Sequence, residues 1–302
     1  RLIDQMLELY HRAIGGARPK PHDDHIYALP APHYENHLSI PVRETSNDDE
    51  AARQAQSRGQ FLARQERWSE LVHEIKAADQ MRHCTPGAVP LGELLAFGAR
   101  SDVVLAAEHA LGDGKPARDA ELSQGIKSLE AARADMPDDP YMALVVALTH
   151  LDIGWAWRGT GWHAQMPRLN RERCTAHFDR ASELLAPHCG IELNSPLIAA
   201  ARCALLARER RPHLRVADDY EDLIDLDPHN HRHMRALGYH LLPQWFGDYG
   251  ELELEARRTA ARTQDIWGAG GYTWVMFDAI TIDEEACARV DATFFIDGLR
   301  AI

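Results

Sequence analysis

Residues 139–158 read DPYMALVVALTHLDIGWAWR, and this stretch decides the fold class. Asp139 is a helix-capping residue, and the proline after it suits the first turn of a helix because the backbone N–H at that position has no partner. Apolar side chains then recur at helical spacing along one face, namely Tyr141, Leu144, Leu148, Leu151 and Trp155. The spacing predicts an amphipathic helix that must bury this face against a neighbour.

Two further helix starts repeat the pattern of a capping residue followed by proline, at Ser195-Pro196 and at Asp227-Pro228. Asn47 precedes Glu50 by three residues, which predicts reciprocal capping of another helix. The apolar spacing extends this helix toward residue 81 with a break near 65–67. Further helices are expected over 91–111 with an interruption near 98–101, and over 119–135, 140–157, 171–186, 196–209, 213–226, 228–242 and 251–263.

Strand signals are almost absent, because period-two alternation does not occur and β-branched residues are scarce. Short connections between one-sided helices give antiparallel pairs, and consecutive pairs stack. We therefore predict an all-α fold over 47–302, a degenerate α-solenoid of antiparallel helix pairs. Residues 1–46 are expected to precede this stack, within one domain overall, as a short helix over 2–14 and an extended arm rich in proline and histidine, since proline at that density prevents regular helix.

The balance of charge excludes several functional classes. The 302 residues include 33 Lys+Arg and 46 Asp+Glu, a net charge of −13. Nucleic acid is not an expected partner, because binding it needs a cationic surface. No membrane span is expected, since no apolar run reaches the roughly 18 residues that one requires. The start at Arg1 shows no charged-then-apolar leader, which favours a cytoplasmic location.

The stretch over 220–259 resembles a tetratricopeptide unit. The end of one repeat is matched by Tyr220, Leu223, Asp227 and Pro228, and the start of the next by Met234, Leu237, Gly238 and Leu241. Gly238 would let two helix backbones approach, and Gly247 would permit the turn between helices. Two extra residues lie between these glycines and the helix-ending prolines are unevenly spaced, so a strict array is not expected.

Two longer signatures resemble an uncharacterised group of bacterial helical-repeat proteins. GWAWRGTG over 154–161 matches that group's aromatic-x-Arg-Gly turn, and LPQWFG over 242–247 matches its Leu-Pro-x-Trp-x-Gly turn. The second turn departs from the group, which usually has Trp-Gly-Gly where this chain has Trp245-Phe246-Gly247. The resemblance covers roughly residues 120–265 and implies a helical-repeat fold without implying an activity.

The 17 histidines include two clusters that are candidates for metal binding. On a helix over 228–242, His229, His233 and His240 would lie within about 40° of one another, the arrangement of metal ligands on one helix face. The alternative is that they pair with nearby Asp225 and Asp227 or face solvent. The arm adds a second cluster with His22, His25, His33 and His37, but HYENH over 33–37 is not the HExxH zinc motif. No cofactor is otherwise expected, since nucleotide-binding and nucleophile-elbow motifs are absent.

Aromatic residues and an arginine cluster at the two turns. Trp157, Arg158 and Trp162 form the first group, and Trp245 and Phe246 form the second. Such residue types dominate interface energetics, so they are candidates for anchoring a partner. The alternative is that they fill the joints between helix pairs.

The sequence favours a scaffold that holds a protein or peptide partner on the concave face of its helical stack. The acidic charge favours a basic partner segment. The alternative is a metal-dependent or acid–base enzyme that brings arm histidines against those of 229–240.

Overall fold

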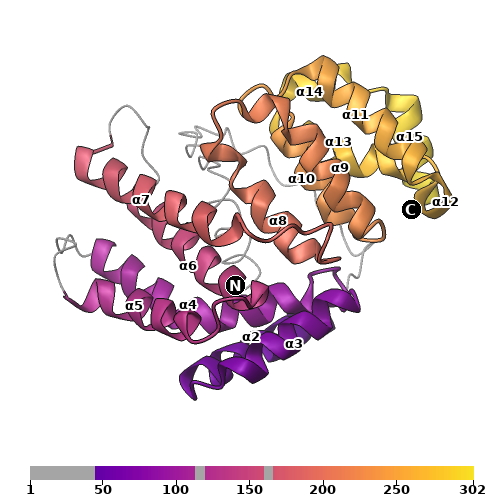
Figure 1. The fold of residues 1–302 in the computed structure, drawn as a ribbon. Coiled ribbons are helices and arrows are strands. Elements are labelled where there is room, and N and C mark those ends of the chain that lie inside the picture. Colours follow the sequence, from indigo (N-terminus) through magenta and orange to yellow (C-terminus); the bar gives the residue numbers. More distant parts are fainter. Residues whose placement is uncertain (1–44, 113–119, 160–165) are drawn as a thin grey trace, which may run out of the picture.

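A computed structural model describes residues 45–112, 120–159 and 166–302. Within these residues the chain is helical, and its only β-type pairing is an isolated bridge between Cys84 and Pro90. The α-helices, drawn in Figure 1, are α2 (Asn47–Arg64), α3 (Trp68–Gln80), α4 (Leu91–Gly112), α5 (Ala120–Ala134), α6 (Pro140–Arg158), α7 (Arg168–Leu185), α8 (Pro196–Ala204), α9 (Val216–Leu226), α10 (His231–His240), α11 (Tyr249–Arg262), α12 (Gln264–Trp267), α13 (Gly270–Ile282), α14 (Glu284–Arg289) and α15 (Ala292–Ala301). The prediction of an all-α fold is confirmed.

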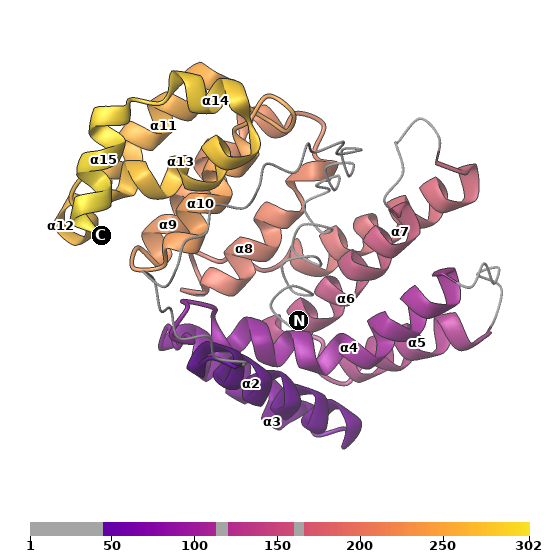
Figure 2. The same ribbon diagram turned by 180° about the vertical axis from the view of Figure 1, so that it is seen from behind.

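The helices form two groups with α8 between them, as the two opposite views show (Figures 1 and 2). The first group, α2–α7, packs around a core that includes Leu62, Ile75, Leu144 and Phe178. The second group, α9–α15, packs around another core that includes Val216, Leu237, Leu252 and Tyr272. Helix α8 contributes side chains to both cores, with Ile198 in the first and Cys203 in the second.

A buried carboxylate fixes the start of α8 against the first group. Asp79, at the end of α3, accepts hydrogen bonds from the Ser195 hydroxyl, from the Tyr141 hydroxyl at 3.0 Å and from the Leu197 backbone N–H at 3.1 Å. Burial raises the pKa of Asp79 above its ordinary value, because the surroundings disfavour the charged form. Three helices therefore meet at this one side chain.

Several predicted boundaries are corrected by the structure. Helix α2 is capped by Ser46 and Asp49, one residue before the expected Asn47 and Glu50. Helix α10 begins at His231 with Asn230 as its cap, because the Asp227 side chain bonds to His233 and does not cap. Helix α9 begins at Val216, after two 3₁₀ turns over 206–208 and 212–214.

Two features of the helices differ from expectation because of packing. Helix α4 runs without interruption through Gly98, where the missing side chain makes room for the backbone of Gln56 on α2. Helix α13 was not predicted, since it is apolar all round and shows no one-sided stripe.

No helix among the described residues is long and apolar enough to cross a membrane. The arm predicted over 1–46 lies outside these residues except for its last two.

Candidate functional site

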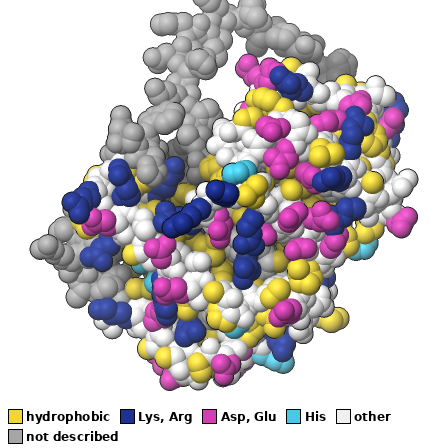
Figure 3. Space-filling model, turned by 45° about the horizontal axis from the view of Figure 1, so that its top comes forward, with side chains coloured by type: hydrophobic (Ala, Val, Ile, Leu, Met, Phe, Trp, Pro, Cys, Tyr) yellow, Lys and Arg dark blue, Asp and Glu magenta, His cyan; other side chains and the backbone are white. Residues whose placement is uncertain are grey.

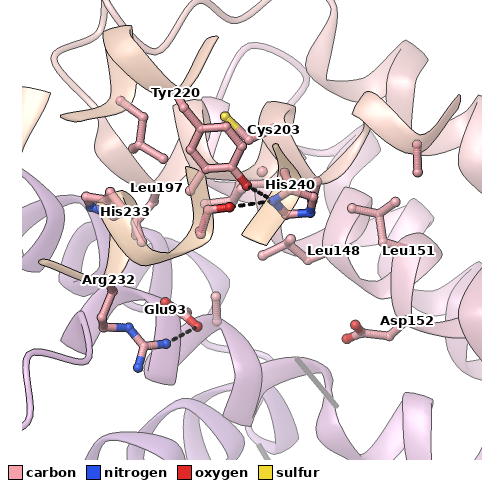
Figure 4. Close-up of a pocket in the computed structure, with 18 of the residues that line it drawn as sticks. Glu93, Leu148, Leu151, Asp152, Leu197, Cys203, Tyr220, Arg232, His233 and His240 are labelled. Carbon is pink, nitrogen blue, oxygen red and sulfur yellow. Dashed lines mark hydrogen bonds and ion pairs between the residues drawn. The ribbon is translucent and has the colours of Figure 1, made fainter. Parts of the chain in front are cut away.

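A cavity of about 210 Å³ opens between the two groups of helices (Figure 4). Its walls come from helices α4, α6, α8, α9 and α10, together with the turn after α10. The lining is mainly apolar, with the aliphatic residues Leu144, Leu148, Leu151, Leu197 and Leu223 and the aromatic residues Phe97, Trp155, Tyr220, Trp245 and Phe246. An apolar cavity with a few convergent polar groups is the usual form of a ligand site.

His240 organises the aromatic side of the cavity. Its Nδ1 lies 2.7 Å from the Tyr220 hydroxyl and 2.9 Å from the Ala236 carbonyl oxygen. Its ring stacks on Phe246 with a centroid separation of 5.6 Å, and Figure 4 shows Tyr220 and His240 pointing at one another. Burial lowers the pKa of His240 to about 4, so its imidazole is neutral at pH 7. Tyr220, His240 and Phe246 therefore form an uncharged wall of the cavity.

Two ion pairs supply the charges of the cavity. Arg100 Nε on α4 donates to Asp152 Oδ2 on α6 at 2.6 Å, and both side chains are largely buried. Arg232 on α10 lies 4.0 Å from Glu93 on α4, at more exposed positions. In Figure 4 Asp152 lies on the opposite side of the view from the Glu93–Arg232 pair.

The three histidines predicted as metal ligands lie in different surroundings. His229 precedes α10 and is exposed, so it does not share a helix face with the other two. His233 Nε2 lies 3.2 Å from Asp227 Oδ2, while His240 contacts Tyr220. The described residues contain no group of three or more histidine, cysteine or acidic side chains placed to hold a metal ion.

The predicted aromatic anchors separate into two sets. Trp245 and Phe246 line the cavity, whereas Trp157 is buried in a small core with Ala107, Ile126 and Ile153. The Arg158 guanidinium lies 5.3 Å from the ring centre of Trp155, which itself lines the cavity. Trp162 lies outside the described residues.

Sequence reasoning missed the Arg100–Asp152 pair. A signal was present, because Asp152 interrupts the apolar stretch over 139–158 and follows Leu148 at helical spacing on the buried face. Its partner could not be identified, since Arg100 lies 52 residues away on another helix.

Comparison of the chain with protein-family models, with curated proteins and with solved structures gave no match. The resemblance to tetratricopeptide repeats and to the bacterial helical-repeat group therefore stays a prediction.

Proposed function

We propose that this chain is a binding module that holds a protein or peptide segment in the cavity between its two groups of helices. The observation that carries the proposal is the composition of the walls, since helices α4, α6, α8, α9 and α10 all contribute to one apolar, aromatic-rich cavity. Stacked helix pairs present alternate helices on one face, which is where such proteins bind extended partners.

The chemistry of the lining favours apolar side chains as the groups that enter. Five aromatic rings and several leucines line the cavity, and burial of apolar area is the main source of affinity in such a site. Outside it, acidic and basic side chains are intermixed with apolar patches on the face shown in Figure 3. The net charge of −13 favours a partner segment that carries basic residues beside its apolar ones.

A pocket-filling variant tests the proposal. Peptides would be selected from a random display library on the full chain, and their affinity measured for the wild type and for Ala200→Trp. Ala200 is a half-buried cavity residue on α8, so the indole would occupy the space the peptide needs. We expect the selected peptides to bind Ala200→Trp about 30-fold more weakly, the effect of losing about 2 kcal/mol at a buried anchor.

Ala261→Trp is the matched control, because Ala261 is exposed on α11 and does not line the cavity. This variant should bind the same peptides as the wild type. Selected peptides that bind both variants equally would show that the cavity is not the binding site. The metal-dependent alternative has no observation among the described residues in its favour.

A further inference from the structure

Arg100 carries a buried donor that has no partner. Only about 9% of its side chain is exposed, and its Nε donates to Asp152 Oδ2. Its Nη1 is buried and makes no hydrogen bond. A guanidinium keeps its charge and all five N–H donors at any physiological pH, so burying the two N–H groups of Nη1 unpaired is costly. Because Arg100 lines the cavity, we take an occupant of the cavity as the source of the missing acceptor.

The charges around the cavity decide what kind of acceptor the occupant must offer to Arg100. Two cationic side chains, Arg100 and Arg232, are balanced by two carboxylates, Asp152 and Glu93. A further carboxylate, Asp227, lies beside His233 just behind the wall. Among the described residues the lining therefore has no excess of positive charge with which to neutralise an anionic ligand, and a carboxylate would be repelled by Asp152. A neutral carbonyl oxygen avoids this repulsion.

Asp152 adds the complementary acceptor. Its Oδ2 receives the Arg100 Nε, and about 16% of its side chain is exposed, so the carboxylate has lone pairs left for an N–H donor. The cavity lining thus holds an unpaired donor on Arg100 and an acceptor on Asp152, the two kinds of group that the C=O and N–H of an amide require.

We propose that the Arg100–Asp152 pair binds a neutral amide of the occupant, with the C=O accepting from Arg100 and an N–H donating to Asp152. The ligand class is therefore an apolar side chain attached to a peptide main chain. This inference rests on the proposed function and specifies how the peptide is recognised.

Three small probes that share one skeleton test it: phenylbutanamide, phenylbutanoate and butylbenzene. Their dissociation constants for the full chain would be measured from methyl shifts of the cavity leucines in two-dimensional NMR spectra. The wild type should bind the amide about tenfold more tightly than either of the others, the effect of one hydrogen bond to a charged donor.

Two variants separate recognition from folding. Asp152→Asn leaves the charge of Arg100 unbalanced, so it should reverse the order and bind phenylbutanoate about tenfold more tightly than the amide. The double variant with Arg100→Met and Asp152→Leu replaces a buried pair with apolar groups, which buried sites commonly tolerate. The double variant should still bind butylbenzene and should no longer bind the amide more tightly than the other two probes.

The results that would overturn the role of Arg100 and Asp152 differ from the result that would overturn the proposed function. A wild type that prefers phenylbutanoate, or a double variant that still prefers the amide, would overturn the assignment of Arg100 and Asp152 while leaving the cavity as a binding site. Binding of butylbenzene without a preference for the amide would have the same meaning. If none of the three probes binds the wild type, the proposed function fails together with this inference.

Discussion

At the scale of single residues, a pair of histidines, one buried and one partly buried, links α6 to α7. His150 Nδ1 lies 2.8 Å from His177 Nδ1, and His150 Nε2 lies 3.0 Å from Glu130 Oε1. Only one proton fits between the two facing nitrogens, so the contact needs at least one neutral ring. Burial lowers the pKa of His177 to about 4 and also lowers the pKa of His150.

This pair predicts loss of stability in acid. A histidine with a lowered folded-state pKa contributes stability that is complete above its unfolded pKa of about 6.5 and is lost as the pH falls toward the folded value near 4. Within that window His177→Gln should flatten the fall in the free energy of unfolding by about 1 kcal/mol per pH unit. Urea unfolding at several pH values measures this slope.

The control for this prediction is His73→Gln, since His73 is exposed on α3. In His73→Gln the free energy of unfolding should depend on pH as it does in the wild type. An unchanged slope in His177→Gln would mean that the acid sensitivity comes from other groups, among them His231 and His240, whose pKa values burial also lowers to about 4.

At the scale of helices, Gly238 sets the distance between α10 and α13. A Cβ built at this position would lie 1.7 Å from the Val275 carbonyl oxygen, which is backbone and cannot move alone. The tetratricopeptide resemblance predicted that Gly238 allows two helices to approach. The approach is present, and the partner is α13, a helix that the sequence did not predict.

Gly238→Ala should therefore force α10 and α13 apart. We expect the free energy of unfolding to fall by about 3 kcal/mol, as in overpacked cores, in urea titrations followed by circular dichroism. Gly112→Ala is the matched control, because no described residue lies within 4 Å of a Cβ at the end of α4 and alanine favours helix. A Gly238→Ala protein as stable as the wild type would show that the two helices can separate without cost.

At the scale of the whole molecule, α8 belongs to both apolar cores. Ile198 is fully buried against the first group, and Cys203 on the same helix packs in the second. The proposed binding cavity lies where these cores meet, so its shape depends on both groups keeping their positions on α8.

We predict that the two groups of helices unfold together. Ile198→Ala should lower the free energy of unfolding by about 3 kcal/mol through loss of buried area and the cavity it leaves. Because α8 is shared, near-ultraviolet and far-ultraviolet circular dichroism should report one transition, shifted equally for both signals. Two separated transitions in the variant or the wild type would show that each group folds independently.

Local patterns were enough to predict much of the fold. The cap-and-proline starts at Asp139 and Ser195 are helix caps in the structure, and the break between α2 and α3 falls at the expected residues. The same pattern at Asp227 gave a wrong helix start, because the Asp227 carboxylate contacts His233 in the folded chain and Asn230 caps α10 instead. Helix α13 escaped prediction because a helix with apolar residues all round carries no one-sided periodic signal.

The sequence by itself determined the all-α class, since capping and apolar spacing act over a few residues of one helix. It also singled out Trp245 and Phe246, two of the cavity's aromatic residues. Only the tertiary structure decided that α8 joins two cores and that Arg100 meets Asp152 beside an apolar cavity. Those contacts join helices far apart in the chain, and they depend on how the buried faces pack, which no local pattern specifies.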